Sequence, residues 1–231
     1  MHRQFVTTCS PIRRTLEPDA WERKFAMKNP TPPIRSVQQQ RESTRALAYG
    51  GMAVALSAVL SLVVVWKMPQ GGTVTAASML PLVFFALAFG VRWGVLAGTV
   101  FGGIQLLLPG AFLVHPVQVL LDYPLAFAAL GLAGVFALPA AKRAESPELL
   151  RRVARLPLFA PVLGTLLAMA ARTLCHVLSG VVFFALYAPE GQNVWLYSLV
   201  YNGSYMIPEA VVTAALLTVF LTGLHRAWKR P

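Results

Sequence analysis

A single carboxylate, Asp122, lies inside the long apolar stretch that runs from His115 to Leu138. Burying a charged side chain in bilayer hydrocarbon costs about 2.5–3.5 kcal/mol on insertion scales, so such a residue usually faces a cavity or a partner. Asp122 is therefore a candidate ligand-binding residue, and Tyr123 beside it adds an aromatic ring. The alternative is a helix-end carboxylate that points to interfacial water.

Further polar and aromatic residues occur in the last two apolar stretches. His176, Gly180 and Phe184 are spaced at i, i+4 and i+8, which places them on one helix face. Tyr197 and Asn202 lie at the start of the final stretch. Structural explanations remain open: His176 and Phe184 could be packing residues, and Gly180 could allow a close helix contact. Tyr197 could belong to an interfacial aromatic belt, and Asn202 could bond to another helix.

Two other pairs of residues have a structural explanation at least as good as a functional one. Arg172 and Glu209 lie near the middle of their apolar stretches, and we interpret them as a mutual ion pair in preference to ligand contacts. Gly51 and Ala55 form a small-xxx-small spacing, which allows another helix to approach closely. That face could pack within the chain or receive a partner subunit.

The composition is typical of a membrane protein with several spans. Of 231 residues, 56% are hydrophobic and 13% are charged, the latter about half the usual share of soluble domains. The sequence predicts an all-α integral membrane fold, with one six-helix domain over residues 46–225. The expected transmembrane segments are about 46–66, 74–91, 93–109, 117–138, 159–186 and 197–224.

The basic residues give these segments an orientation. They precede the first segment and follow the sixth, and five of them (Lys142, Arg143, Arg151, Arg152 and Arg155) occupy the loop between the fourth and fifth. Because cytoplasmic loops carry an excess of Lys and Arg, both termini are expected in the cytoplasm. The net charge of +11 therefore reflects membrane topology and does not indicate nucleic-acid binding.

The sequence predicts two tails outside the membrane domain. Residues 1–45 are polar and without clear periodicity, which predicts a disordered, basic cytoplasmic tail. Met27 offers a second start, so part of this tail could be an artefact of gene-start assignment. Residues 226–231 form a short basic cytoplasmic tail.

The orientation brings the candidate residues to one depth, toward the outer side. Asp122 and Tyr123 lie in the outer third of the fourth segment, and His176 lies in the outer half of the fifth. Trp66 and the pair Gly71–Gly72 belong to the first external loop. The sequence therefore predicts a polar, ring-lined pocket that opens to the outside.

Several catalytic signatures are absent from the sequence. It contains no Walker A motif, no HExxH, no GxSxG and no Cys/His cluster with metal-ligand spacing. We therefore expect neither an enzyme nor a self-powered pump, and no metal or cofactor. A pocket without an energy motif indicates a capture subunit that depends on another protein for energy.

Long blocks of the sequence resemble a known family. The blocks are GGTVTAASMLPLVFFALAFGVRWGVLAGTVFGGIQLLL, HPVQVLLDYPLAFAALGLAGVF, RTLCHVLSGVVFFA and YSLVYNGSYMIPEAV, within residues 46–225. They resemble the thiamine-specific substrate-binding (S) components of energy-coupling factor (ECF) transporters. The resemblance implies a six-helix S-component fold that binds thiamine near the extracellular side. It also implies partnership with a transmembrane coupling (T) subunit and two ATPase subunits.

The resemblance also implies site residues. The family's binding positions fall on Asp122, Tyr123, His176, Gly180, Phe184, Tyr197 and Asn202, with Trp66 as the expected first-loop aromatic. Some members have Glu where this chain has Asp122, and some have Trp where it has Phe184. Gly51 and Ala55 fall where family members dock the coupling subunit.

Three alternative functions remain open. The chain could be an S component for another vitamin or for a thiamine precursor, such as a free pyrimidine or thiazole. It could also be a membrane-embedded enzyme with His176 and Asp122 as acid and base, or a scaffold that binds no small molecule.

Overall fold

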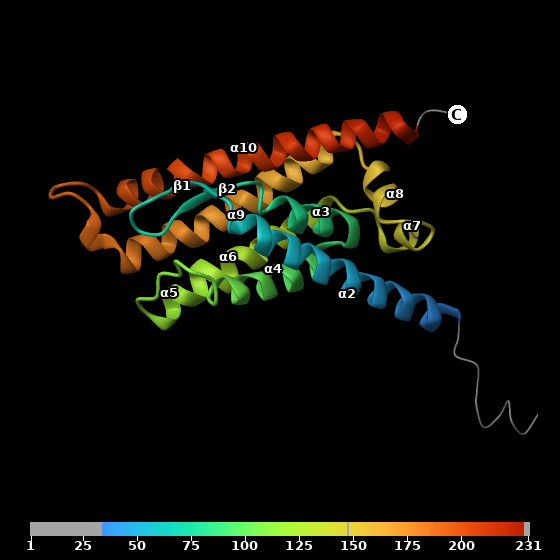
Figure 1. Cartoon of the computed structure of the whole chain (residues 1–231), viewed down its shortest axis with the longest axis horizontal. Coiled ribbons are helices and arrows are strands. Elements are labelled where there is room, and N and C mark those ends of the chain that lie inside the picture. The colour runs from blue at the N-terminus through green and yellow to red at the C-terminus, as the bar shows by residue number, and fades with distance from the viewer. Residues whose placement is uncertain (1–33, 147, 229–231) are drawn as a thin grey trace, which may run out of the picture. The chain divides into compact units, whose positions relative to one another are not determined.

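The computed structural model describes residues 34–146 and 148–228, and most of them are helical (Figure 1). Two short strands pair as a hairpin, and three short segments are π- or 3₁₀-helical. The helices are α2 (Ile34–Ser61), α3 (Leu80–Phe89), α4 (Val91–Gln105), α5 (Pro116–Leu120), α6 (Ala126–Ala128), α7 (Ala140–Ala144), α8 (Leu149–Ala154), α9 (Phe159–Phe183) and α10 (Val194–Trp228). The remaining elements are β1 (Val64–Lys67), β2 (Thr73–Thr75), the π-segment η1 (Leu121–Leu125) and the 3₁₀-segments η2 (Ala129–Phe136) and η3 (Ala185–Tyr187).

Within the described residues, four helical segments are long and apolar enough to cross a membrane: Val37–Ser61, Pro116–Phe136, Phe159–Phe183 and Val194–Ala227. Each of the six predicted segments contains helix, but α3 and α4 have only 10 and 15 residues. At 1.5 Å per residue α3 is about 15 Å long, half of the roughly 30 Å hydrocarbon core. Six membrane-crossing helices therefore stay a prediction.

The expectation of a purely α-helical domain is wrong in the first loop. The first helix ends at Ser61, and β1 pairs with β2 in an antiparallel hairpin. Val and Thr dominate both strands, and β-branched side chains favour extended backbone over helix. Gly71, with φ +95°, lies in the connection. The predicted helical segment 74–91 is accordingly shortened, because its first residues belong to β2.

The core is centred on α3, which is apolar on all sides and buried from Leu82 to Phe89 except at the partly buried Phe84. Only Gly90, with φ +89°, separates α3 from α4, and the left-handed backbone there reverses the chain. On α4, Gly94, Gly98 and Gly102 face the backbone of residues 123–131 at a distance that leaves no space for a side chain. These glycines allow the segment that carries Asp122 to pack directly against α4.

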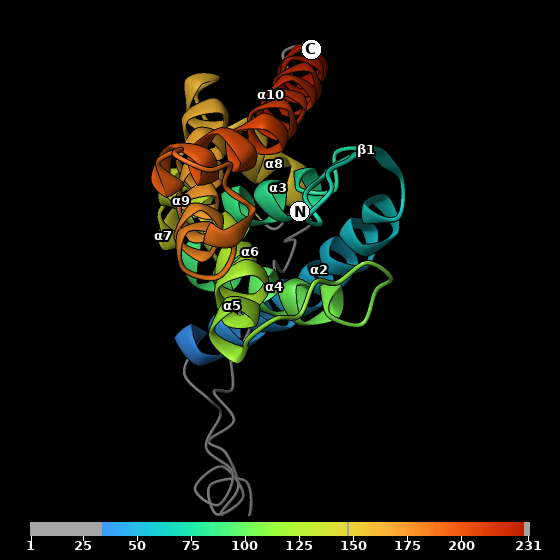
Figure 2. The same cartoon turned by 90° about the vertical axis from the view of Figure 1, so that its left-hand side faces the viewer.

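The last two long helices, α9 and α10, pack side by side in both views, and β2 lies against α10 (Figures 1 and 2). Helix α8 lies beside the C-terminal part of α10, and α7 (Ala140–Ala144) precedes α8 at the same end of the molecule (Figure 1). There Nε2 of His225 lies 2.6 Å from the carbonyl oxygen of Ala154. The hairpin and α5 lie toward the other end of α10, so the two groups of connecting segments are separated along the helices.

Part of the predicted disordered tail is helical. Residues 34–45 belong to α2, because their Gln, Arg and Glu side chains are good helix formers. Glu42 accepts two hydrogen bonds of 2.6 Å from Arg152 of α8, whose side chain is only 2% exposed. Residues 1–33 lie outside the described residues, as do 229–231 of the predicted C-terminal tail, while 226–228 end α10.

Candidate functional site

A cavity of about 210 Å³ lies between η1, α9, α10, the β1–β2 hairpin and the loop that precedes α5. An apolar cavity of roughly 150 Å³ accommodates benzene, so a small ring-containing molecule can enter this one. Seven of the eight predicted substrate-binding residues line it: Asp122, Tyr123, His176, Gly180, Phe184, Tyr197 and Asn202.

Asp122 lies in a π-helical turn that results from the proline at position 124. Pro124 has no N–H and cannot complete the hydrogen bond that an α-helix needs at this position. The helix widens over Leu121–Leu125, a distortion that is frequent at functional sites. This turn places the Asp122 and Tyr123 side chains at the cavity wall.

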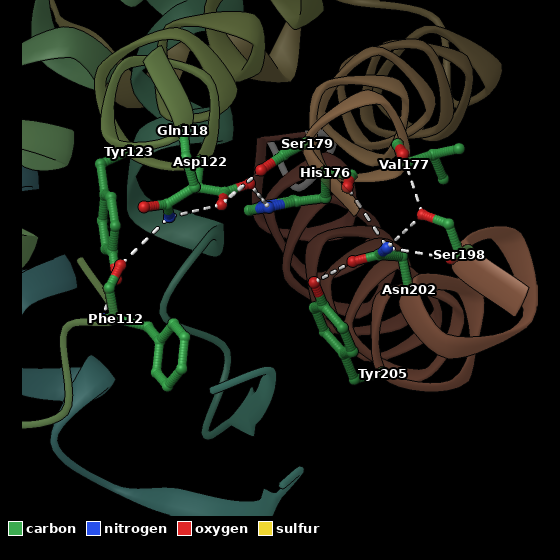
Figure 3. Close-up of polar contacts among 10 residues, drawn as sticks. All are labelled: Phe112, Gln118, Asp122, Tyr123, His176, Val177, Ser179, Ser198, Asn202 and Tyr205. Atoms are coloured by element: carbon green, nitrogen blue, oxygen red, sulfur yellow. Dashed lines mark hydrogen bonds and ion pairs between the residues drawn. The ribbon is translucent and has the colours of Figure 1, made fainter. Parts of the chain in front are cut away.

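The Asp122 carboxylate is held by three side chains from two helices (Figure 3). Gln118 Nε2 and Ser179 Oγ each donate to Oδ2 at 2.7 Å. His176 Nδ1 lies 3.0 Å from Oδ1. A carboxylate has about four acceptor positions, so one remains on Oδ1 for a ligand. Asp122 is therefore fixed in orientation and still able to bind.

Gln118 connects the carboxylate to the loop before α5. Its side chain is 1% exposed, and besides Asp122 its amide donates to the carbonyl of Phe112 and accepts from the N–H of Val114. The Tyr123 hydroxyl accepts a 2.7 Å hydrogen bond from the N–H of Phe112. The N–H and the carbonyl of Phe112 are therefore both hydrogen-bonded, and Phe112 lines the cavity.

His176 offers the cavity a second polar atom. An ionised carboxylate can only accept, so the ring nitrogen next to Asp122, Nδ1, carries a proton. The other nitrogen, Nε2, is buried and has no hydrogen-bond partner among the described residues. In the neutral ring Nε2 is an acceptor, and a ligand N–H or O–H group would satisfy it.

Asn202 belongs to a separate network between α9 and α10 (Figure 3). Its amide nitrogen donates to the carbonyls of Ser198 at 2.9 Å and His176 at 3.3 Å. Its oxygen accepts a 2.6 Å hydrogen bond from Tyr205. With 5% exposure and most of its hydrogen-bonding capacity used, Asn202 chiefly fixes the two helices around the cavity.

Gly180 lines the cavity and also allows a close helix contact. A Cβ atom at this position would overlap Ser198 Oγ and press on the Asn202 amide. Ser198 Oγ donates to the carbonyl of Val177 at 2.8 Å. A side chain at residue 180 would therefore separate α9 from α10 at the depth of the site.

Aromatic rings form much of the remaining wall. Phe112 and Phe184 lie with ring centroids 5.6 Å apart, and Tyr197 stacks on Tyr201 at 6.1 Å. All four rings line the cavity. They come from three separate segments, and such a set suits a flat aromatic ligand.

The structure does not bring Trp66 to the cavity. Its side chain is 66% exposed on β1, whereas Val64 and Lys67 line the cavity. The pairing of β1 with β2 is irregular between Val64 and Trp66. Adjacent side chains of a strand point to opposite sides, so Trp66 points away from the side on which Lys67 lies. The extra residue between Val64 and Trp66 means that these two need not share a side.

The predicted ion pair between Arg172 and Glu209 is also wrong, since no salt bridge joins them in the described part of the chain. Arg172 lies 4.3 Å above the Phe127 ring and donates to Met79 Sδ at 2.8 Å. The Glu209 carboxylate is occupied by hydrogen bonds from Thr75 of β2. These donors belong to the hairpin, which the sequence did not predict, and they take the place of Arg172 as partners of Glu209.

The family model for thiamine transporter protein (Thia_YuaJ) matches residues 47–228. The chain belongs to the thiamine transporter family. This confirms the resemblance seen in the sequence, and the family is one of membrane transport proteins and not of enzymes.

Individual members of the thiamine transporter family agree with this assignment. Thiamine transporter ThiT of Bacillus subtilis is 39% identical over 163 residues, which are 71% of this chain and 82% of that protein. ThiT of Lacticaseibacillus paracasei is 33% identical over 147 residues, 62% of this chain and 71% of that protein. The solved structure of ThiT from Listeria monocytogenes shares the fold, with a TM-score of 0.65 and 23% identity over 78% of this chain and 95% of that one.

Several residues that shape the site of this thiamine transporter were not predicted from the sequence. Gln118 precedes Asp122 by four residues and Ser179 follows His176 by three, which are helix-neighbour spacings that could have indicated them. Phe112 and the hairpin residues gave no comparable signal. Their positions depend on how loops pack against helices distant in sequence.

The small-residue face of α2 does not pack against any other described part of the protein. Gly51 and Ala55 are exposed, and a Cβ atom on Gly51 would meet nothing within 4 Å. Met52, Leu56 and Val59 are exposed on the same helix. Of the two roles considered for this face, packing inside the described part of the chain is excluded.

Proposed function

We propose that the protein captures thiamine from the extracellular side of the cell membrane and is the S component of an ATP-driven uptake transporter. The observation that carries the proposal is the Asp122–His176 pair inside an aromatic cavity, in a chain of the thiamine transporter family. The protein makes and breaks no bond in the vitamin. Its task is to bind, orient and release it.

The hydrogen-bonding groups suit the aminopyrimidine ring of thiamine. This ring carries an exocyclic amine and two ring nitrogens, so it offers donors and acceptors along one edge. The free position of Asp122 and Nε2 of His176 are both acceptors, so they can pair with the N–H groups of the exocyclic amine. A hydrogen bond to a charged group contributes about 1.5–3 kcal/mol, so Asp122 is the expected anchor.

The rings and charges suit the thiazolium, which is a permanent cation. Tyr123, Phe184 and Tyr197 line the cavity, and each aromatic face can contribute about 0.5–2 kcal/mol of cation–π attraction. Near the site lie two carboxylates, the half-buried Asp122 and the buried Glu209, and one buried guanidinium, Arg172. One negative charge is therefore in excess, and a monocation compensates it. Lys67 is exposed, so solvent screens it.

The proposed orientation places the cavity at the outer surface and both termini in the cytoplasm. Its support is the basic side chains of the α7–α8 region and the end of α10, which lie away from the hairpin (Figure 1). Cytoplasmic segments carry such an excess of Lys and Arg. A cavity near the hairpin would then be accessible to vitamin outside the cell.

Energy is proposed to come from partners, namely a transmembrane T subunit and two ATPase subunits. The sequence has no Walker A motif of its own. The exposed small-residue face at Gly51 and Ala55 is the proposed docking surface for the T subunit. Small residues allow helix backbones to approach closely in lipid, where the hydrophobic effect does not drive association.

Binding of thiamine to the purified protein in detergent tests the proposal. Titration calorimetry with thiamine should give a one-to-one complex, and a free pyrimidine or thiazole precursor should bind far more weakly. A tighter complex with either precursor would assign the site to that precursor, and no binding of any of them would overturn the proposal. Uptake by proteoliposomes that also contain a T subunit and two ATPase subunits should require ATP.

A further inference from the structure

Three residues of α10 form a stripe that contacts the hairpin. Tyr201, Tyr205 and Glu209 are spaced at i, i+4 and i+8, so they share one face of the helix. The Tyr201 hydroxyl accepts a 2.9 Å hydrogen bond from the N–H of Gln70. The Tyr205 ring lies so close to Gly72 that a Cβ atom there would overlap it. The third contact, at Glu209, is the most polar.

Glu209 holds the last residue of β2 with both carboxylate oxygens. Oε2 accepts from the N–H of Thr75 at 2.8 Å, and Oε1 accepts from the Thr75 hydroxyl at 2.6 Å. The Thr75 hydroxyl also lies 2.6 Å from that of Ser78. Glu209 is 2% exposed and Thr75 is 5% exposed. A buried carboxylate is tolerated only when it is paired or hydrogen-bonded, and here the hairpin supplies the donors.

The hairpin in turn forms one wall of the cavity. Lys67, Gln70, Gly71 and Thr73 line it, whereas Glu209 does not. Movement of the hairpin away from α10 would therefore open the cavity along this wall. Glu209 does not reach the cavity, so it makes no contact with a ligand, and apart from its charge it can influence a ligand only through the hairpin.

We infer that Glu209 is a positioning residue that fixes the β1–β2 hairpin against α10 and so slows the departure of bound ligand. The inference rests on the proposed function, because it needs a ligand that leaves. Tyr201 and Tyr205 contact both the hairpin and the cavity, whereas the Glu209–Thr75 contact is separate from the binding surface. Its removal should change the dissociation rate without removing any group that the ligand touches.

Paired variants of Thr75 test this with little change in volume. Thr75→Val removes the hydroxyl that Glu209 binds, and Thr75→Ser keeps it. Thr213→Val is the matched control, because Thr213 is fully buried on the same helix face and its hydroxyl has no hydrogen-bond partner in the described residues. Stopped-flow fluorescence with thiamine should show dissociation about tenfold faster for Thr75→Val, the effect of losing one hydrogen bond to a charged group. Thr75→Ser and Thr213→Val should stay within about twofold of the unsubstituted protein.

Glu209→Gln tests the same contact from the other side. The amide can accept only one of the two hydrogen bonds, so dissociation should again be faster by about tenfold. The effects of Thr75→Val and Glu209→Gln should not multiply in the double variant, because both remove the same interaction. Equal rates for Thr75→Val and Thr213→Val, whether fast or slow, would overturn the inference.

Hydrogen–deuterium exchange of the ligand-free protein separates hairpin release from general loss of stability. Thr75→Val and Glu209→Gln should speed amide exchange in residues 62–75 and leave α9 unchanged. Faster exchange throughout would mean a merely structural role and would overturn the inference. If the unsubstituted protein bound no thiamine, the proposed function would fail, while exchange in the hairpin would still test the role of Glu209.

Discussion

The Asp122 carboxylate on η1 lies 3.0 Å from Nδ1 of His176 on α9, across 54 residues of sequence. This contact orients both side chains at the cavity. It leaves His176 Nε2 without a partner and one acceptor position on Asp122 open. Two adjacent polar groups beside several aromatic rings are a strong determinant of which ligand fits.

Asp122→Asn should weaken thiamine binding at least tenfold. The amide keeps the volume of the side chain but removes the charge that anchors the pyrimidine and compensates the thiazolium. Calorimetry on the purified protein measures the dissociation constant. Glu190→Gln, which neutralises an exposed carboxylate in the loop before α10, is the control and should bind as the unsubstituted protein does. Unchanged affinity of Asp122→Asn would remove Asp122 from the site.

Gln118→Leu should lower both affinity and thermal stability. The leucine leaves the carbonyl of the half-buried Phe112 without its partner, and an unpaired buried group costs about 1–3 kcal/mol. The N–H of Val114 also loses its partner, but Val114 is exposed and water can replace the hydrogen bond. The leucine also frees Asp122 to turn. We expect at least a tenfold loss of affinity and a lower unfolding midpoint in detergent. Gln105→Leu is the matched comparison, since Gln105 lines the cavity but is not a partner of Asp122; an equal loss there would contradict a special role of Gln118.

Phe112→Ala should weaken binding severalfold, whereas Trp66→Ala should not. Phe112 lines the cavity and pairs with Phe184, and an aromatic pair contributes about 0.5–1.5 kcal/mol beyond burial. Trp66 is 66% exposed and outside the cavity lining. Fluorescence quenching by thiamine, with calorimetry as a check, compares the two. A larger loss for Trp66→Ala would mean that the hairpin rearranges when the ligand binds.

Gly180→Ala should destabilise the protein by about 1–3 kcal/mol, because the new methyl group overlaps Ser198 Oγ. Removal of that oxygen in the double variant Gly180→Ala/Ser198→Ala should restore most of the lost unfolding midpoint. Thermal unfolding in detergent without thiamine measures the effect apart from binding. If the double variant were no more stable than Gly180→Ala, the close contact between α9 and α10 would not be the cause.

Much of this protein was determined by its sequence alone. The apolar segments predicted a membrane protein. The isolated carboxylate inside one of them made Asp122 a candidate binding residue, because hydrocarbon rarely accepts an unpaired charge, and Asp122 lines the cavity. Helical spacing placed His176, Gly180 and Phe184 on one face, and all three line the cavity. These inferences hold because periodicity and burial cost depend on residue type and local order.

Only the tertiary structure decided which groups meet. The hairpin replaced part of two expected helices, directed Trp66 away from the cavity and supplied Thr75 as the partner of Glu209 in place of Arg172. Gln118 and Phe112 joined the site through contacts between a loop and the π-helical turn. In each case several hydrogen-bond donors or packing surfaces, distant in sequence, could have served as the partner. Which of them forms the contact depends on which comes within hydrogen-bonding distance, and only the packed chain determines that.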